Sequence, residues 1–349
     1  MINGAIAQLG ERYTGSVEVS GSNPLSSTNI LKLGLKPMPV IAFYSKGTSL
    51  EVQNIWEKRL KLYLPSINLV PLLSEEAKLA IVALLWKAPL DHLSQLNKIK
   101  GIISLGQGVD HILNQSSIPN NIPLVRIIDP YMAKSMSHWV LLSVLNIIRE
   151  TYDYFNQENK KIYKPRDEKD FLSVRIGVYG IGAIGSVVAK DLSYMGFNVQ
   201  GWSRTKKNIK TIKCFHGDKG FNKLVNNSDI HVCLLPLTPS TFNIFNKDTF
   251  AKMKKGSCFI NAGRGEHVVE DDLLKSCKSR HVSNAVLDVY RTEPLPKNHP
   301  FWQQDNIRLW PHVAAETNPE TAAKQIANAI KCIDNNIVPP NTVNRILGY

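Results

Sequence analysis

Three side chains that could carry out acid–base chemistry each stand at the end of a short apolar run. They are Arg264, Glu293 and His312. In an open α/β sheet, ligands bind at the carboxyl ends of the strands, so we expect these side chains to meet in one crevice. A planar guanidinium can bind a carboxylate or polarise a carbonyl oxygen. An imidazole can donate a proton to that oxygen while a carboxylate holds its other ring nitrogen. The three residues therefore predict proton transfer to the carbonyl of a substrate whose carboxylate is bound by the arginine.

Each of the three also has a simpler interpretation that the sequence leaves open. Arg264 could form a structural salt bridge, Glu293 could be a turn carboxylate, and His312 could pack at a strand end. Their shared position beside a glycine-rich motif favours a joint role in chemistry. Three other histidines lack this setting, and we interpret them as structural or solvent-exposed: His138, His267 and His281.

The glycine-rich motif is GIGAIG at residues 180–185. The pattern alone is weak, but here it follows an expected strand and opens an expected helix, which is the context of a dinucleotide site. Gly180 permits a tight turn, Gly182 lets a pyrophosphate approach the backbone, and Gly185 permits close packing of helix on strand. The free N–H groups of the helix then face the phosphates. A glycine-rich turn without a ligand is the alternative, and the predicted contacts are Gly180, Gly182, Ala183, Ile184 and Gly185.

The residues after the second strand of this unit predict which dinucleotide binds. An NAD site needs a carboxylate there to hold the ribose 2′-hydroxyl. The sequence instead reads SRTKK at residues 203–207. Arg204, with Ser203, Thr205 and Lys206, offers cations and hydroxyl groups to a 2′-phosphate. We therefore expect NADPH rather than NADH, unless Arg204 only covers an exposed loop.

Composition excludes several classes of protein. The 349 residues are enough for two domains, and 43% apolar residues are typical of a globular protein. No run approaches the roughly 20 apolar residues that cross a bilayer, so we expect no membrane partner. The net charge of +13 could indicate nucleic-acid binding, but without an aromatic–basic module we favour a solvated, lysine-rich surface that attracts anions. The five scattered cysteines predict reduced thiols in a cytoplasm and no metal site.

The chain divides into three segments by pattern. We interpret residues 1–37 as a non-native or disordered N-terminal extension, because their Gly-, Ser- and Asn-rich composition shows no period. Residues 38–136 plus 315–349 predict a flavodoxin-like substrate domain, and residues 137–314 a Rossmann domain; both are doubly wound α/β sheets with a cleft between them. The expected strands are 40–44, 79–85, 101–105, 124–127, 174–179, 197–202, 230–235, 258–261, 285–289 and 307–310. The main expected helices are 49–62, 137–154, 183–195 and 319–334.

In these motifs the chain resembles the D-2-hydroxyacid dehydrogenase family, and within it the bacterial glyoxylate/hydroxypyruvate reductases of the A type. The resemblance runs from about Met38 to Tyr349. It rests on LGQGVD at 105–110, WSRT at 202–205, HVVEDDLL at 267–274, RTEPLP at 291–296 and PHVAA at 311–315. It implies NADPH-dependent reduction of glyoxylate and hydroxypyruvate, with Arg264, Glu293 and His312 as the catalytic set. It also implies a cytoplasmic homodimer formed through the cofactor domain, where we expect an exposed helix near Trp139.

The resemblance also implies further contacts. Those expected for the substrate are Trp86, Gly106, Gln107, Gly108 and Arg264, with backbone N–H groups of residues 106–108 binding its carboxylate. Those expected for the cofactor are Leu235, Pro236, Ala262, Gly263 and Asp288, the last near the nicotinamide carboxamide. Two residues depart from the family pattern. Gln107 replaces a small residue, and Lys87 stands where His is more usual, where it is either a loop lysine or a second cation for a carboxylate.

Two other functions remain as alternatives. One is a different enzyme of the same family, such as a phosphoglycerate or formate dehydrogenase. Formate oxidation needs no proton donor to a carbonyl, so the Glu293 and His312 pair argues against a formate dehydrogenase. The absence of an added regulatory domain argues against a phosphoglycerate dehydrogenase. The other is a protein that binds NADPH without turnover, which the loss of a catalytic residue would have favoured; none is lost.

Overall fold

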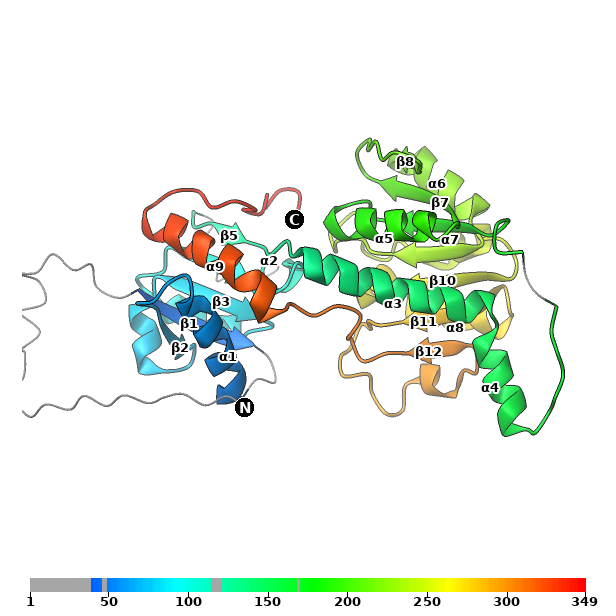
Figure 1. Ribbon diagram of the computed structural model, residues 1–349, viewed down its shortest axis with the longest axis horizontal. Coiled ribbons are helices and arrows are strands. Elements are labelled where there is room, and N and C mark those ends of the chain that lie inside the picture. The colour runs from blue at the N-terminus through cyan, green and yellow to red at the C-terminus, as the bar shows by residue number, and fades with distance from the viewer. Residues whose placement is uncertain (1–38, 46–48, 114–117, 119–120, 168–169) are drawn as a thin grey trace, which may run out of the picture. The chain divides into compact units, whose positions relative to one another are not determined.

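A computed structural model describes residues 39–45, 49–113, 118, 121–167 and 170–349. The expected N-terminal extension lies outside these residues. Within them the chain forms two parallel α/β sheets, one of five strands and one of seven (Figure 1). The expected fold class of two doubly wound sheets is therefore confirmed.

The first sheet has the flavodoxin-like strand order β2-β1-β3-β4-β5, with every neighbouring pair parallel. We call this sheet and the helices packed on it the five-stranded lobe. Its strands are β1 (Val40–Ser45), β2 (Asn68–Pro71), β3 (Val82–Trp86), β4 (Gly101–Ser104) and β5 (Leu124–Val125). The segments between them include α1 (Leu50–Lys61), α2 (Asp110–Leu113) and the 3-10 helices η2 (Glu75–Leu79) and η3 (Leu90–Gln95).

Helix α9 (Pro319–Asp334) returns to this lobe after the second sheet is complete. Its buried residues include Ala322, Ile326, Ile330 and Ile333, whose spacing of three and four places them on one face. That face packs against α1 and β4, and Figure 1 shows α9 beside α1. Gly101 makes room for it, since a Cβ there would lie 2.6 Å from Cδ1 of Ile333. The expected return of this helix is confirmed with the expected bounds.

The second sheet has the order β12-β11-β10-β9-β6-β7-β8, and we call it with its helices the seven-stranded lobe. The chain moves outward from β6 on one side and restarts at β9 on the other, so the switch point lies between these strands. The strands are β6 (Arg175–Tyr179), β7 (Asn198–Ser203), β8 (Lys213–His216), β9 (Ile230–Cys233), β10 (Ser257–Asn261), β11 (Val282–Leu287) and β12 (Ile307–Leu309). The helices are α5 (Ala183–Tyr194), α6 (Gly217–Asn227), α7 (Lys247–Lys252), α8 (Glu270–Lys278), η4 (Gly265–His267) and η5 (Pro300–Gln303).

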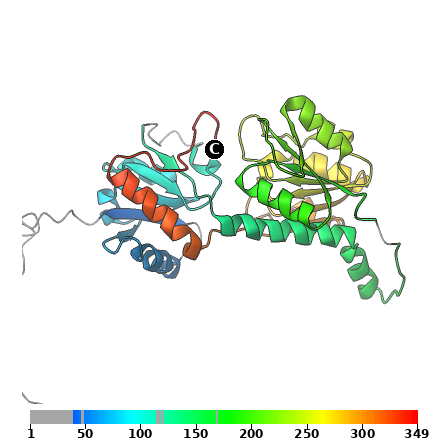
Figure 2. The same ribbon diagram turned by 45° about the horizontal axis from the view of Figure 1, so that its top comes forward.

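The expected single helix at 137–154 is wrong in both bounds. The structure has α3 (Pro130–Ile148) and a separate α4 (Thr151–Asn159), divided at Glu150, whose φ is 52°. Helix α3 begins earlier because Pro130 occupies its first turn and the Asp129 carboxylate accepts from the N–H of Tyr131. It packs along α5, as Figure 2 shows. The expected domain boundary at 137 therefore falls inside one continuous helix.

Helix α3 is exposed near Trp139 at His138 and Leu142, but Trp139 itself is buried. The Trp139 side chain is only 7% exposed, and its ring lies 5.9 Å from that of Trp310 in an edge-to-face arrangement. The large hydrophobic side chains that α3 leaves exposed are those of Tyr131, Leu142 and Leu145. An apolar period alone did not separate the face that packs on the sheet from the face left to solvent.

Two edge strands were not expected from the sequence. They are β2 and β8, each of four residues and paired on one side only. Short edge strands carry little of the apolar pattern that marks a buried strand. The expected strand at 79–85 begins late, because residues 75–79 form η2 and β3 starts at Val82.

The described helices include none long and apolar enough to cross a membrane. In the same described segments, no three His, Cys, Asp or Glu side chains are grouped so that they could hold a metal ion. All five cysteines are free thiols. Burial raises the pKa of Cys233 and Cys277 to about 12, so both are packing residues rather than nucleophiles.

Candidate active site

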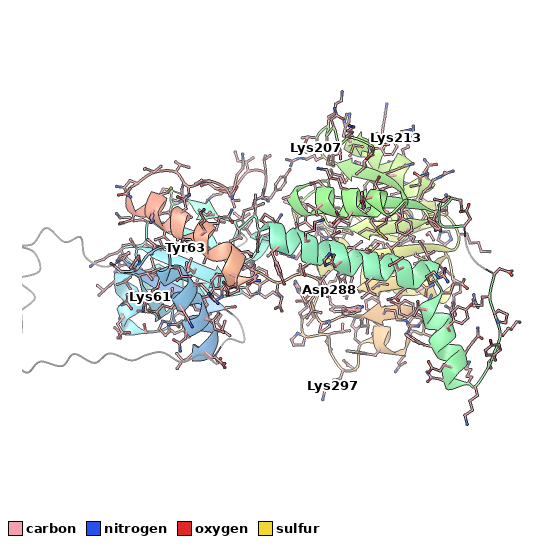
Figure 3. The ribbon with its side chains drawn as sticks, in the orientation of Figure 1. Lys61, Tyr63, Lys207, Lys213, Asp288 and Lys297 are labelled. Atoms are coloured by element: carbon pink, nitrogen blue, oxygen red, sulfur yellow. The ribbon has the colours of Figure 1, made fainter. Side chains whose placement is uncertain are left out.

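A cavity of about 1920 Å³ lies where the strand ends of both lobes meet. It is lined by Arg264, Glu293 and His312 together with the glycine-rich loop. Every expected cofactor and substrate residue lines it except Lys206. Lys207 takes that place on the wall instead, and Figure 3 marks it beside β7 and β8. Exposed loop residues have no periodicity to show which of two adjacent lysines faces inward.

His312 and Glu293 form a direct pair in this cavity. His312 Nδ1 lies 2.8 Å from Glu293 Oε2, and the other carboxylate oxygen accepts from the N–H of Tyr290 at 3.2 Å. Burial opposes ionisation of Glu293, yet hydrogen bonds from His312 and Lys87 lower its pKa to about 2. A charged carboxylate must receive a proton from Nδ1, so Nε2 is the nitrogen left for a substrate. Among the described residues, Nε2 has no partner.

Asp288 holds the loop that presents His312. Its two carboxylate oxygens accept from the N–H groups of Val313, at 2.8 Å, and Ala314, at 3.0 Å. Its side chain is 2% exposed, and burial raises its pKa although these hydrogen bonds oppose the shift. His312 has a φ of 59°, a left-handed conformation that costs free energy without such support. Asp288, marked in Figure 3, thus positions the imidazole and also lines the cavity.

Arg264 reaches from the seven-stranded lobe to the five-stranded lobe. Its Nε donates to both carboxylate oxygens of Asp110, at 3.0 and 3.2 Å, and Nη1 donates to the carbonyl of Gly263 at 2.8 Å. Burial raises the Asp110 pKa, but the charges of Arg264 and His111 together with hydrogen bonds to the carboxylate outweigh burial, and the net shift is downward. Arg264 therefore does form a structural salt bridge, as the simpler interpretation expected. Its Nη2, however, has no acceptor among the described residues and remains available to a ligand.

Two glycines let the walls of this cavity approach closely. A Cβ on Gly108 would lie 1.6 Å from Arg264 Nη2, and a Cβ on Gly106 would lie 2.3 Å from the Trp86 ring. The N–H of Gly106 donates to Ser104 Oγ at 3.3 Å. The N–H groups of Gln107 and Gly108 have no acceptor in the described part of the chain. Together with Nη2 of Arg264 they form an anion-binding corner.

His267 supports Arg264 from behind. The N–H of Arg264 donates to Nδ1 of His267 at 3.0 Å, so the proton of the ring lies on Nε2, which is 3.2 Å from the carbonyl of Pro236. The imidazole is fully buried, and burial lowers its pKa to about 4. A neutral histidine therefore ties the arginine loop to the loop after β9, which agrees with its interpretation as structural.

The glycine-rich loop has the conformation that a dinucleotide requires. Gly180 has a φ of 101°, and a Cβ there would lie 2.6 Å from the carbonyl oxygen of Leu234. A Cβ on Gly185 would lie 2.0 Å from the carbonyl oxygen of Gly180, so helix α5 packs tightly on the turn. At Gly182 the same test finds no atom within 4 Å. The open space at Gly182, at the start of α5, fits a pyrophosphate.

The loop after β7 carries a cation where an NAD site carries a carboxylate. Strand β7 ends at Ser203, whose hydroxyl donates to the carbonyl of Thr205 at 2.7 Å. Arg204 follows and is exposed, and its Nη2 donates to the hydroxyl of Tyr349 at 2.7 Å. This arrangement fits the additional phosphate of NADPH better than a bare ribose.

Residues 139–314 match the family model described as D-isomer specific 2-hydroxyacid dehydrogenase, NAD binding domain. The chain is also 37% identical over 272 residues to glyoxylate/hydroxypyruvate reductase A of Serratia proteamaculans (strain 568), covering 76% of this chain and 87% of that protein. The chain belongs to the D-isomer specific 2-hydroxyacid dehydrogenase family. The resemblance found in the sequence is therefore confirmed.

Solved structures agree with this 2-hydroxyacid dehydrogenase assignment. One is a D-isomer specific 2-hydroxyacid dehydrogenase from Xanthobacter autotrophicus Py2 in complex with NADPH and MES, with a TM-score of 0.84 and 31% identity over 89% of this chain and 100% of that one. Another is an NADPH-dependent glyoxylate/hydroxypyruvate reductase from Sinorhizobium meliloti in complex with NADP and sulfate. It has a TM-score of 0.82 and 30% identity over 89% of this chain and 100% of that one.

The sequence left Lys87 open as a loop lysine or a second cation, and several other residues of this dehydrogenase site were not expected as site residues. Lys87 Nζ donates to Glu293 Oε2 at 2.8 Å, the same oxygen that His312 contacts. Asp110, Arg126 and Tyr349 also line the cavity. Asp110 stands in the LGQGVD motif, which was the available signal. Nothing in the local pattern around Arg126 or Tyr349 indicates that they reach the other lobe.

Proposed function

We propose that this dehydrogenase uses NADPH to reduce small 2-ketoacids, glyoxylate to glycolate and hydroxypyruvate to D-glycerate. The observation that carries the proposal is the Glu293–His312 pair facing the same cavity as Nη2 of Arg264 and the glycine-rich loop. The names of the Serratia and Sinorhizobium relatives support this choice of substrate and cofactor.

The residues of the cofactor site fit NADPH. The open space at Gly182 and the N-terminus of α5 would hold the pyrophosphate. Arg204 would pair with the 2′-phosphate, with hydroxyl groups of the same loop beside it. When bound, the nicotinamide supplies the hydride that the reduction requires.

The substrate acid would be held by its charge. Nη2 of Arg264 and the N–H groups of Gln107 and Gly108 donate to its carboxylate and to the adjacent carbonyl oxygen. These donors are already in place, so they can stabilise the negative charge that develops on that oxygen. Arg264 does not swing away, because Asp110 and Gly263 hold its Nε and Nη1.

The proton would come from His312. As hydride reaches the carbonyl carbon, Nε2 of His312 donates its proton to the carbonyl oxygen, giving the hydroxyl of the product. Glu293 keeps Nδ1 protonated and so fixes which nitrogen faces the substrate. In the reverse direction, neutral His312 would accept the hydroxyl proton.

The bulky side chains beside the 106–108 loop favour small acids. The Trp86 ring closes one side against Gly106, and the His111 ring lies edge-to-face with it at 4.8 Å. Gln107 adds a side chain to the loop where the family pattern has a small residue, and its Oε1 is buried with no hydrogen-bond partner among the described residues. A two- or three-carbon ketoacid is the substrate class that we expect to fit. The C3 hydroxyl of hydroxypyruvate would then donate to Oε1 of Gln107.

The domain division and assembly complete the proposal. We retain 38–136 plus 315–349 as the substrate domain and 137–314 as the cofactor domain, with α3 as the shared crossover.

We also propose a cytoplasmic homodimer through the cofactor domain, supported by the exposed Leu142 and Leu145 on α3. Light scattering of the purified protein tests this, and a monomer at all concentrations contradicts it.

The decisive experiment follows NADPH oxidation by absorbance with glyoxylate, hydroxypyruvate and pyruvate. The wild type should turn over the first two, and His312→Gln should lose activity by roughly 100-fold or more while still binding NADPH. His138→Gln is the matched control, since His138 is exposed on α3 and does not line the cavity. NADPH binding without turnover of any 2-ketoacid would favour a sensor and refute the reductase.

A further inference from the structure

The segment 339–349 is attached to the edge of the five-stranded sheet. Val125 and Thr342 form an isolated antiparallel bridge. On either side of it, Val343 N–H donates to the carbonyl of Leu124 at 2.7 Å and Arg126 N–H donates to the carbonyl of Asn341 at 3.2 Å. The segment therefore extends the sheet beyond β5 and places Arg126 beside it.

The end of the same segment contacts the seven-stranded lobe. Gly348 has a φ of 80°, and a Cβ there would lie 3.1 Å from Cγ2 of Thr238 in the loop after β9. One residue on, the Tyr349 hydroxyl accepts from Arg204 Nη2 at 2.7 Å, and the Arg204 guanidinium carbon lies 5.2 Å from the centre of the Tyr349 ring. Tyr349 thus brings a group anchored in one lobe to the cofactor loop of the other.

Arg126 approaches the same ring from the five-stranded lobe. Its guanidinium carbon lies 6.0 Å from the centre of the Tyr349 ring, and the residue is half-buried and lines the cavity. Burial lowers the pKa of Arg126. Within the described residues, its guanidinium has neither a carboxylate partner nor a hydrogen-bond acceptor. A half-buried cation without such a partner can take an anionic ligand as its counter-ion.

The three side chains leave hydrogen-bond donors close to one another. Arginine can only donate, so the hydroxyl oxygen of Tyr349 accepts from Arg204 and its own O–H remains free to donate. The guanidinium groups of Arg126 and Arg204 both lie over this ring. Lys207 and Asp218 also line this cavity. The side chains of Arg126, Arg204 and Tyr349 together carry two positive charges and no carboxylate.

We propose that Arg126 and Tyr349 complete, with Arg204, the binding site for the adenosine 2′-phosphate of the cofactor. The inference rests on the proposed use of NADPH and adds a contribution from the five-stranded lobe. A phosphate there would accept from the Tyr349 hydroxyl and from both guanidinium groups. The preference for NADPH over NADH then depends on both lobes, and the phosphate end of the cofactor helps to hold them together.

The test measures binding of two ligands that lack the nicotinamide, 2′-phospho-ADP-ribose and ADP-ribose, by calorimetry. Arg126→Gln and Tyr349→Phe should each weaken the binding of 2′-phospho-ADP-ribose by roughly tenfold, since each removes a hydrogen bond to a charged group. Binding of ADP-ribose should be unchanged in both, which also shows that the variants are folded. The loss should shrink as salt is raised.

The matched controls are Arg308→Gln and Tyr152→Phe. Arg308 lies over the ring of Tyr152 at 4.5 Å, so the pair has the same chemistry, but neither residue lines the cavity. Both controls should leave the ratio of the two affinities unchanged. If Arg204→Gln alone lowers the affinity for 2′-phospho-ADP-ribose relative to ADP-ribose, the roles of Arg126 and Tyr349 are wrong while the use of NADPH stands. If the wild type binds both ligands equally, the NADPH assignment itself is wrong.

Discussion

Arg264 and Gly108 fit together so closely that no side chain can stand between them. A Cβ on Gly108 would lie 1.6 Å from Nη2 of Arg264 and 2.7 Å from its Cζ. The arginine is held on its other side by Asp110. Its free nitrogen is therefore placed against the backbone of the five-stranded lobe, next to the N–H groups that we expect to bind the substrate carboxylate.

Gly108→Ala should displace the Arg264 guanidinium and lower kcat/KM for the 2-ketoacid by about 100-fold, because a shift of about 1 Å is enough for such a loss. Affinity for NADPH should be unaffected. Steady-state kinetics with each substrate varied in turn measures both effects.

Gly182→Ala is the contrasting variant, because its Cβ meets no protein atom within 4 Å and points into the space assigned to the pyrophosphate. It should weaken NADPH binding and leave KM for the 2-ketoacid nearly unchanged. Equal effects of the two variants on both substrates would show that the two sites are not separated in this way.

Lys87→Gln should make the enzyme more sensitive to acid. Lys87 and His312 both contact Oε2 of Glu293 and together hold its pKa near 2 against burial. Removing one cation raises that pKa, so the carboxylate is lost at a higher pH as the solution is acidified. The acid limb of the kcat/KM profile, measured between roughly pH 4 and 7, should shift to higher pH.

Lys61→Gln is the control for this shift. Lys61 forms a 2.7 Å ion pair with Glu57 on α1, away from the cavity. Its profile should match that of the wild type. A Lys87→Gln profile that superimposes on the wild-type profile would contradict the coupling of Lys87 to Glu293.

The double change Ser203→Asp with Arg204→Ile should shift preference from NADPH toward NADH. The new carboxylate can accept from a ribose 2′-hydroxyl and repels a 2′-phosphate, while the isoleucine removes the cation. The ratio of kcat/KM for the two cofactors should change by at least about tenfold. Unchanged selectivity would refute the assignment of this loop.

Acid should destabilise the folded protein through its buried histidines. Burial lowers the pKa of His231 to about 3 and that of His267 to about 4, below the ordinary value of 6.5. Between 6.5 and these values the unfolded chain binds protons that the folded chain does not. The contribution of these two histidines to stability is therefore fully present above pH 6.5 and is lost as pH falls toward 4 for His267 and toward 3 for His231.

His231→Gln should flatten this dependence by up to about 1.4 kcal/mol per pH unit, the effect of one proton. Urea unfolding at several pH values measures it, and the slope is the readout because the variant also loses the 2.9 Å contact with Tyr179 Oη. His138→Gln should leave the slope unchanged. A His231→Gln slope equal to that of the wild type would assign the acid sensitivity to other groups.

The sequence by itself determined the parts of this dehydrogenase that depend on local order. The GIGAIG turn, the polar residue after each strand and the regular period of α9 are encoded within a few residues of one another. Parallel strands bring their carboxyl ends to one edge, so Arg264, Glu293 and His312 could be placed together before any contact was known. The start of α3 and the edge strands β2 and β8 were missed, because capping and one-sided pairing leave a weak pattern.

Only the tertiary structure decided which residues from the two lobes meet. Asp110 and Arg264 are 154 positions apart, Lys87 and Glu293 are 206 apart, and Arg204 and Tyr349 are 145 apart. No local period links such pairs, because each depends on how two separately folded sheets close on one cavity. The same closure made glycine the only residue type that fits at position 108 beside Arg264, and it brought Arg126 and Tyr349 to the cofactor loop.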